Sequence, residues 1–169
     1  MESRGGGLAF TCISQSEKCW WGVVSARAWT MRFAGRVFKV GRMWAIEVPI
    51  LGVATQGRTK KESFVMIADA IESLVNKPGF AVKVHPEKND YFEIDSPDQA
   101  ALTAFLLRRK RTLEGLSLSA VARRLGSSSL NGYARYEQGR AVPSIEKLGR
   151  LLAAVSGTGD FVLSDSRSR

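Results

Sequence analysis

The most constraining feature of this sequence is the division of its last third into short, helix-length segments by glycine, serine and proline. Gly115, Gly126 and Gly139 each follow a segment with helical periodicity, and Pro143-Ser144 precedes another. Glycine at such a position ends helices, whereas serine caps their N-termini and proline is favoured in the first turn. The pattern predicts four short helices over residues 98–157.

Apolar residues in these segments recur at the three-and-four spacing of one buried helical face. The first helix is followed by Gly115, and Ser117 caps the second. The third should turn Tyr133 and Tyr136 inward and therefore Asn131, Ala134 and Arg135 outward. The predicted core positions of the other helices are Leu102, Phe105, Leu106, Leu113, Val121, Ala122, Leu125, Leu148, Leu151, Leu152 and Val155. Short helices with these faces predict a compact all-α domain.

Charge is unevenly distributed along the chain. Of 169 residues with a formal net charge of +9, residues 1–100 hold 13 basic and 11 acidic side chains, whereas residues 101–169 hold 12 and 5. A basic segment beside a nearly neutral one is typical of phosphate binding, although a solvated basic face has the same composition. Charge therefore indicates a nucleic-acid partner without establishing one.

Two short helices joined by a small turn, the second polar and basic outside, suit the DNA major groove. Arginine can bind guanine and asparagine adenine in bidentate fashion, while serine hydroxyls and helix N-terminal amides bind phosphate. The candidate DNA-binding residues are Ser128, Ser129, Asn131, Ala134, Arg135 and Arg140. We expect operator DNA as a partner, bound by a homodimer or higher homo-oligomer, because one short helix reads few base pairs.

The segment from Gly115 to Ser144 resembles the helix-turn-helix of the XRE family of regulators. The resemblance rests on GLS at residues 115–117, AxRLG at 122–126, YExGR at 136–140 and PS at 143–144. It implies a lambda-repressor-like DNA-binding domain. It also implies a structural role for Glu137, which in that family holds the third helix to the first through an arginine. Arg111 is the nearest match, with Arg108 and Arg109 as alternatives.

Residues 31–97 have the pattern of a small α+β domain. Two strands at 36–40 and 43–48, joined through Gly41-Arg42, predict a hairpin, and a third strand covers 52–56. Thr59 with Glu62 forms a capping-box pattern before an amphipathic helix that ends near residues 76–79. A strand at 80–84 and an additional one at 91–94 follow. The predicted fold class is α+β, a β-β-β-α-β domain followed by an all-α helix-turn-helix domain.

This N-terminal segment resembles the degraded ribonuclease H fold of HicB-type antitoxins. The resemblance rests on WAIEVP at residues 44–49, GVATQG at 52–57 and the helix opening Thr59-x-x-Glu62. It implies an antitoxin that neutralises a HicA-type toxin, a small mRNA ribonuclease, and represses its own operon. A repressor whose N-terminal domain oligomerises or senses a ligand, and an active nuclease, are the alternatives. Glu47, Glu62, Asp69 and Glu72 suit a solvated surface better than a metal site, so we expect no enzyme and no cofactor.

An acidic stretch lies at the end of the α+β segment, and we expect the two domains to have separate cores. Because an RNA-binding toxin must be basic where phosphate binds, the stretch is a candidate toxin-binding surface. A charged edge strand followed by a polar linker is the alternative. The candidate partner-binding residues are Glu87, Asp90, Glu93 and Asp95.

The two ends of the chain lack a clear helical or strand periodicity of apolar residues. Residues 1–30 are expected to form a poorly ordered extension, with Met31 as a candidate translation start, and residues 158–169 a C-terminal tail. Cys12 and Cys19 have no second metal-binding pair, which favours free thiols and no metal site. No signal peptide or membrane-spanning run is evident, so a cytoplasmic location is expected.

Overall fold

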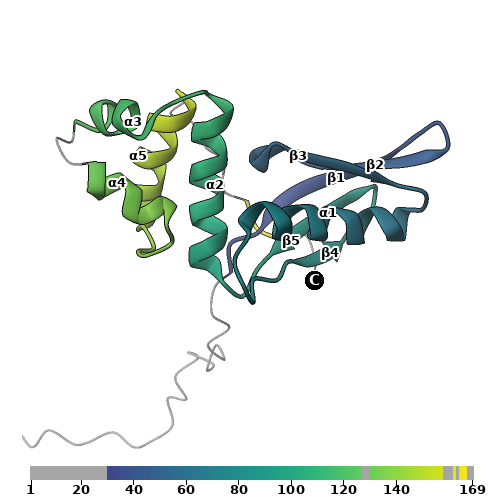
Figure 1. The fold of residues 1–169 in the computed structure, drawn as a ribbon. Helices are drawn as coiled ribbons and strands as arrows, with labels where there is room; N and C mark the ends of the chain where they lie inside the picture. Colours follow the sequence, from purple (N-terminus) through teal and green to yellow (C-terminus); the bar gives the residue numbers. More distant parts are fainter. Residues whose placement is uncertain (1–29, 127–129, 158–161, 163, 167–169) are drawn as a thin grey trace, which may run out of the picture.

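The computed structural model describes residues 30–126, 130–157, 162 and 164–166. The predicted α+β class is confirmed, because a sheet with one covering helix precedes a group of four helices (Figure 1). In chain order the elements are β1 (Phe33–Val40), β2 (Met43–Val48), the 3-10 turn η1 (Pro49–Leu51), β3 (Val53–Gly57), α1 (Lys60–Val75), β4 (Lys83–Pro86), β5 (Tyr91–Asp95), α2 (Gln99–Leu113), α3 (Leu118–Arg124), α4 (Leu130–Glu137) and α5 (Ile145–Ser156).

The five strands form one antiparallel sheet in the order β3-β2-β1-β5-β4. The predicted β1-β2 hairpin is present, with Val40 opposite Met43 and Gly41 at a φ of 59° in the turn. The additional strand is also present as β5. Because β5 pairs with both β1 and β4, it is an interior strand, and the expectation of a charged edge strand is wrong.

Helix α1 begins at the predicted capping box. The Thr59 side chain accepts a hydrogen bond of 3.0 Å from the backbone N–H of Glu62, and the Glu62 carboxylate accepts one of 2.7 Å from the N–H of Arg58. The first contact satisfies an N–H group that the first turn leaves without a helical partner, and the second ties Glu62 to the residue before the cap. The helix then lies across one face of the sheet and buries Ile67 and Ile71 against it.

A glycine allows close packing at the centre of the sheet. Gly35 on β1 lies opposite Phe92 on β5, and the Phe92 ring covers the glycine. A Cβ atom at residue 35 would lie 2.2 Å from that ring and 2.7 Å from the carbonyl oxygen of Glu47. Phe92 is fully buried and meets Phe64 of α1 edge to face, with ring centroids 5.6 Å apart. Because Gly35 has no side chain, the Phe92 ring can pack directly against the backbone of β1.

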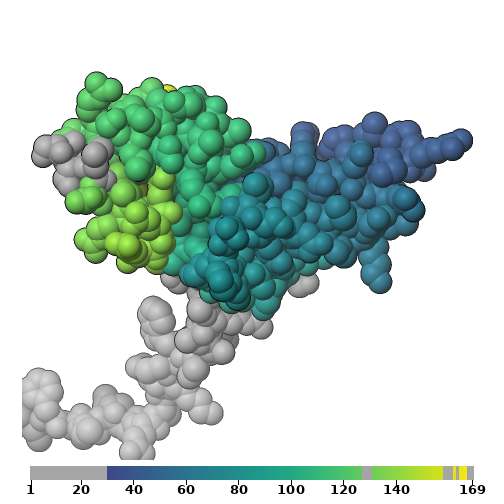
Figure 2. All heavy atoms as spheres, viewed as in Figure 1, coloured from purple at the N-terminus to yellow at the C-terminus, as the bar shows by residue number. Residues whose placement is uncertain are grey.

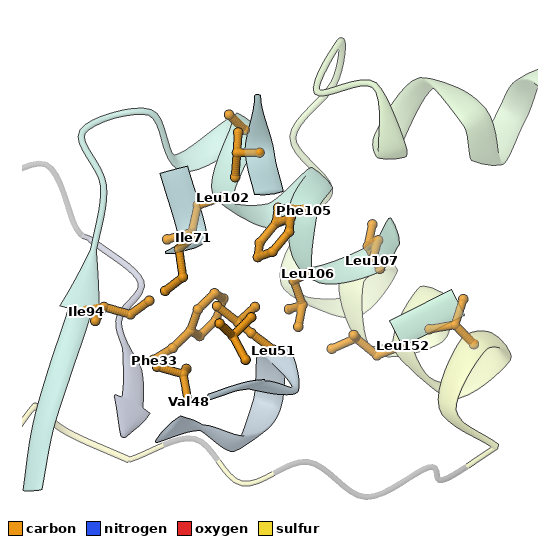
Figure 3. Close-up of a cluster of buried hydrophobic side chains, with 14 of the residues drawn as sticks. Phe33, Val48, Leu51, Ile71, Ile94, Leu102, Phe105, Leu106, Leu107 and Leu152 are labelled. Carbon is orange, nitrogen blue, oxygen red and sulfur yellow. The ribbon is translucent and has the colours of Figure 1, made fainter. Parts of the chain in front are cut away.

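Helix α2 belongs to the cores of both halves of the molecule. All residues from 101 to 107 are buried, so the helix has no solvent-facing stripe over this stretch. Figure 3 shows Phe105 and Leu106 on the side of Leu51 and Ile71, while Leu107 lies near Leu152 of α5. One continuous cluster of buried side chains therefore extends from the sheet to α5. The expectation of separate cores is wrong, because α2 is apolar on both sides.

Two arginines of α2 hold the halves together at the edge of this shared core. Arg109 donates hydrogen bonds to the carbonyl oxygens of Leu51 and Gly52, at 3.2 and 3.1 Å. Arg108 donates one of 2.8 Å to the carbonyl of Leu74 near the end of α1. Figure 2 shows the resulting continuous surface between the sheet and the helices. Arg108 and Arg109 of the basic run at residues 108–111 therefore have structural roles.

Candidate nucleic-acid interface

Helices α3 and α4 form the pair that the sequence predicted. Ser117 caps α3 by accepting a hydrogen bond of 3.1 Å from the N–H of Ala120, and Gly126, at a φ of 67°, follows its last turn. Val121 and Ala122 of α3 are buried, and α3 contacts both α4 and α5. Residues 127–129 lie outside the described residues, and so do the predicted contacts of Ser128 and Ser129.

Helix α4 has one buried and one exposed side. Tyr133 is 2% exposed and Tyr136 is half-buried against the core, as predicted. Asn131 and Arg135 are exposed, and Ala134 between them is intermediate. The helix therefore presents two of the predicted DNA-reading residues to solvent. Their roles in reading bases stay predictions.

A half-buried ion pair joins α4 to α2. The Arg111 guanidinium binds both carboxylate oxygens of Glu137, with Nε to Oε1 at 2.6 Å and Nη2 to Oε2 at 3.0 Å. The same guanidinium donates a hydrogen bond of 2.8 Å to the carbonyl of Leu116, just before α3. Of the three arginines considered for Glu137, the structure selects Arg111. Its bidentate geometry sets the rotation of α4 and hence the direction in which Asn131 and Arg135 face.

Two ionisable groups at this pair have shifted pKa values. The carboxylate of Glu137, through its hydrogen bond, raises the pKa of Arg111 above its ordinary value. Burial raises the pKa of the neighbouring Tyr133 hydroxyl, and the negative charge of Glu137 raises it further. Arg111 therefore stays charged and Tyr133 neutral over the physiological range.

Further exposed polar and basic side chains lie on the helical half of the molecule. Gly139, at a φ of 67°, ends the helix, and Arg140 follows it on the surface. Gln138 is also exposed beside Arg135, although the sequence did not single it out. Its position one turn after Arg135 could have identified it, since residues three and four apart share a helical face. Arg123 of α3 and Arg150 of α5 are exposed as well.

The acidic stretch before α2 does not form a continuous exposed surface. Glu93 and Asp95 are only 8% and 6% exposed, because they lie on an interior strand and face a basic residue. Arg32 contacts Glu93 at 3.1 Å and Asp95 at 3.3 Å, and His85 contacts Asp95 at 2.9 Å. The two buried carboxylates therefore have a structural role here.

The other two candidates of the stretch lie in the turn region between β4 and β5. Asp90 is exposed and forms an ion pair of 2.6 Å with Lys60 at the start of α1. Glu87 is half-buried. The four predicted partner-binding residues thus divide into two buried and two more accessible ones. They do not act together as one charged surface in this fold.

The carboxylates that an active nuclease would need are likewise engaged in separate contacts. Glu47 pairs with Arg36, and Glu72 accepts a hydrogen bond of 2.7 Å from the N–H of Val82. Over the described residues, no three or more histidine, cysteine, aspartate or glutamate side chains come together as metal ligands. Within the same residues, no helix has both the length and the apolar character required to span a membrane.

A family model described as a helix-turn-helix domain matches residues 104–160. This range contains most of α2 and all of α3, α4 and α5. Searches of curated proteins and of solved structures gave no significant match. The C-terminal helices are thus a helix-turn-helix domain, which indicates a DNA-binding regulator. No comparison covers residues 31–97, so the resemblance of that segment to HicB antitoxins stays a prediction.

Proposed function

We propose that this protein is a transcriptional repressor that binds a two-fold symmetric operator through α4 as a homodimer. The observation that carries the proposal is the Arg111–Glu137 ion pair, which fixes α4 with Asn131 and Arg135 outward. A recognition helix needs a fixed rotation, because a bidentate contact with a base tolerates little error in direction. Two copies are needed because a single short helix reads too few base pairs.

The exposed residues divide into two proposed roles. Asn131, Ala134 and Arg135 lie on α4 and would meet base edges, with arginine suited to guanine and asparagine to adenine. Arg140, beyond the end of the helix, would contact phosphate, as would Ser128 and Ser129 before it. Phosphate contacts fix the position on the duplex, whereas base contacts choose the sequence.

Substitutions at two arginines test this division. Arg135→Ala should cost about 1–3 kcal/mol of operator binding and relax the preference at one operator position. Arg140→Ala should weaken binding to every sequence and lower the slope of log K against log salt by about one unit. Binding measured by fluorescence anisotropy on operator and scrambled duplexes gives both quantities. Equal losses on both duplexes for both variants would contradict the assignment.

We further propose that the protein is the antitoxin of a type II pair, in which residues 31–97 neutralise a HicA-type ribonuclease. Support comes from the sequence resemblance at residues 44–49 and 52–62 and from the order of three strands followed by a helix. The neutralising surface would not be the whole acidic stretch, since Glu93 and Asp95 are engaged by Arg32. Asp90 is exposed and would contribute, whereas Glu87 is half-buried and one of its carboxylate oxygens is out of contact with solvent.

Coexpression tests the antitoxin proposal separately from DNA binding. A small basic reading frame beside this gene, expressed alone, should stop growth and cleave mRNA, and this chain should restore growth. Arg135→Ala should restore growth equally well, because α4 is not part of the proposed neutralising domain. If no neighbouring product is toxic, the protein is a repressor whose N-terminal domain has another task.

A further inference from the structure

Among the residues that the structure describes, no helix covers the second face of the sheet. Because α1 and η1 lie on the side of Val37, Ile46 and Val48, the residues that alternate with these point to the opposite side. The register aligns Arg36 with Glu47, Phe38 with Ala45, and Val40 with Met43 on that side, and continues to Ala54 on β3 and Tyr91 on β5. We call this set the open face; it comprises Ala34, Arg36, Phe38, Val40, Met43, Ala45, Glu47, Ala54, Gln56 and Tyr91.

The open face is unusually apolar for a surface in contact with water. The solvent side of an antiparallel sheet normally carries polar residues. Here Phe38, Val40 and Tyr91 are 42%, 55% and 42% exposed, and they share the face with Met43 and three alanines. Contiguous apolar surface of this kind usually marks an interface.

The C-terminal segment limits the open face on one side. Ser166 hydrogen-bonds Arg32 at 3.0 Å and Glu93 at 2.5 Å, so this residue lies beside β5 on the same side of the sheet. The buried Arg32, Glu93 and Asp95 contacts lie beneath this region. The uncovered part of the face therefore consists of β1, β2, β3 and the start of β5.

We propose that the open face binds a second copy of this chain and forms the dimer interface of the repressor. The charged residues of its uncovered part are Arg36 and Glu47, joined by a hydrogen bond of 2.9 Å from Nε to Oε1. The other charged residues on this side of β1 and β5, Arg32, Glu93 and Asp95, contact one another beside Ser166. If a two-fold axis relates two open faces, the neutral pair of Arg36 and Glu47 lies opposite the same pair of the second copy. Each arginine then contacts the glutamate of the other copy. A basic, RNA-binding partner would instead require a face with excess negative charge.

The position of the open face also suits a dimer that binds DNA. Figure 1 shows the β1-β2 hairpin at one end of the molecule and α4 at the other, with α2 between them. Packing of two sheets therefore leaves both copies of α4 accessible. This argument from the position of α4 rests on the proposed binding of a two-fold symmetric operator. The argument from the apolar character of the open face does not depend on it.

The first test compares two glutamate substitutions in the full chain. Phe38→Glu places a charge in the centre of the open face, and Val65→Glu places one at a residue 55% exposed on α1. Light scattering and sedimentation should show a dimer for the wild type and for Val65→Glu. Dimerisation of Phe38→Glu should be weaker by ~30-fold or more, the effect of losing a central apolar contact. An unchanged dimer, or a wild type that is monomeric throughout, overturns the proposal.

A photo-crosslinking experiment separates the possible occupants of the face. With p-benzoylphenylalanine in place of Phe38, crosslinks from one copy to residues 34–47 of another support the proposal. Crosslinks within one chain to residues 1–29 overturn it, because that segment would then be the occupant. Both readouts need no DNA. If the protein forms a dimer that depends on Phe38 but does not bind an operator, the proposed function is refuted while the proposed interface is supported.

Discussion

The two halves of the molecule use similar charged residues for different purposes. In the sheet half, acidic side chains are largely engaged by basic neighbours: Arg32 binds Glu93 and Asp95, and Lys60 binds Asp90. This half is nearly neutral, with 10 basic and 9 acidic residues over 31–100. Its charges therefore stabilise the sheet and its connections more than they create an external field.

In the helical half, one bidentate pair is half-buried and the remaining basic residues are largely at the surface. Arg111 and Glu137 set the position of α4, while Arg123, Arg135, Arg140 and Arg150 are exposed. The long-range positive field of the chain comes mainly from this half. The comparison shows that position in the fold, and not residue type, separates a structural arginine from a candidate DNA contact.

Truncation gives the largest expected effect and tests whether the halves are independent. A chain ending at Pro97 loses α2 and exposes Phe33, Leu51, Ile71 and Ile94, which belong to the shared core. Loss of this much apolar burial exceeds the stability of a domain of this size, so the chain should not fold cooperatively. A chain ending at Glu114 keeps α2 and is the matched control.

Circular dichroism and thermal unfolding distinguish the two truncated chains. The chain ending at Glu114 should retain more sheet structure and should show a steeper thermal unfolding transition than the chain ending at Pro97. A cooperative transition in the chain ending at Pro97, with the wild-type sheet signal, would show that the sheet half has a sufficient core of its own.

The second prediction concerns the ion pair that orients α4. Arg111→Met leaves the Glu137 carboxylate, whose side chain is 7% exposed, without its bidentate partner. Breaking a buried pair in this way should lower the free energy of unfolding by about 3 kcal/mol. Arg123→Met, at an exposed position on α3, should change it by less than ~0.5 kcal/mol. Urea unfolding measures the change in free energy of unfolding for both variants. Similar changes would contradict the distinction between the arginine that pairs with Glu137 and an arginine at the surface.

The third prediction tests close packing in the sheet half. Gly35→Ala places a methyl group against the Phe92 ring and should lower the free energy of unfolding by about 2 kcal/mol. Gly149→Ala, in α5 with nothing near its added Cβ, should raise it by about 0.5–1 kcal/mol through helix propensity. Urea titrations of the two variants should therefore move in opposite directions. A neutral Gly35→Ala would mean that Phe92 moves aside freely.

The smallest expected effect lies where the halves join. Asp98 caps α2 and pairs with Lys77; the hydrogen bond from Lys77 lowers the pKa of the Asp98 carboxyl. A lowered folded-state pKa stabilises the native state above the unfolded-state pKa, and this contribution is lost as pH falls below ~4. Asp98→Asn keeps a capping side chain and should cost less than ~1 kcal/mol at neutral pH.

The same variant should remove part of the acid sensitivity. Stability measured from neutral to acid pH should decrease less steeply in Asp98→Asn than in the wild type below ~4. An identical pH dependence in both proteins would show that the Lys77 pair does not contribute to stability.

Local signals in the sequence predicted most of the secondary structure. The caps at Thr59 and Ser117 and the glycines that end α3 and α4 act within one or two helical turns, so short-range spacing identified them. The inward side of α4 followed from helical periodicity in the same way. The double-sided burial of α2 was missed, although its run AALTAFLL at residues 100–107 is apolar around most of the helix.

What the sequence alone determined is therefore the set of elements and the faces they present over a few residues, because hydrogen bonds and side-chain periodicity within a helix or strand are local. Only the tertiary structure decided which of three arginines binds Glu137, that Glu93 and Asp95 are buried, and that one sheet face stays open. Each of these depends on which distant segments become neighbours. That choice is made by the total burial of apolar surface over the whole chain, which no short window of sequence contains.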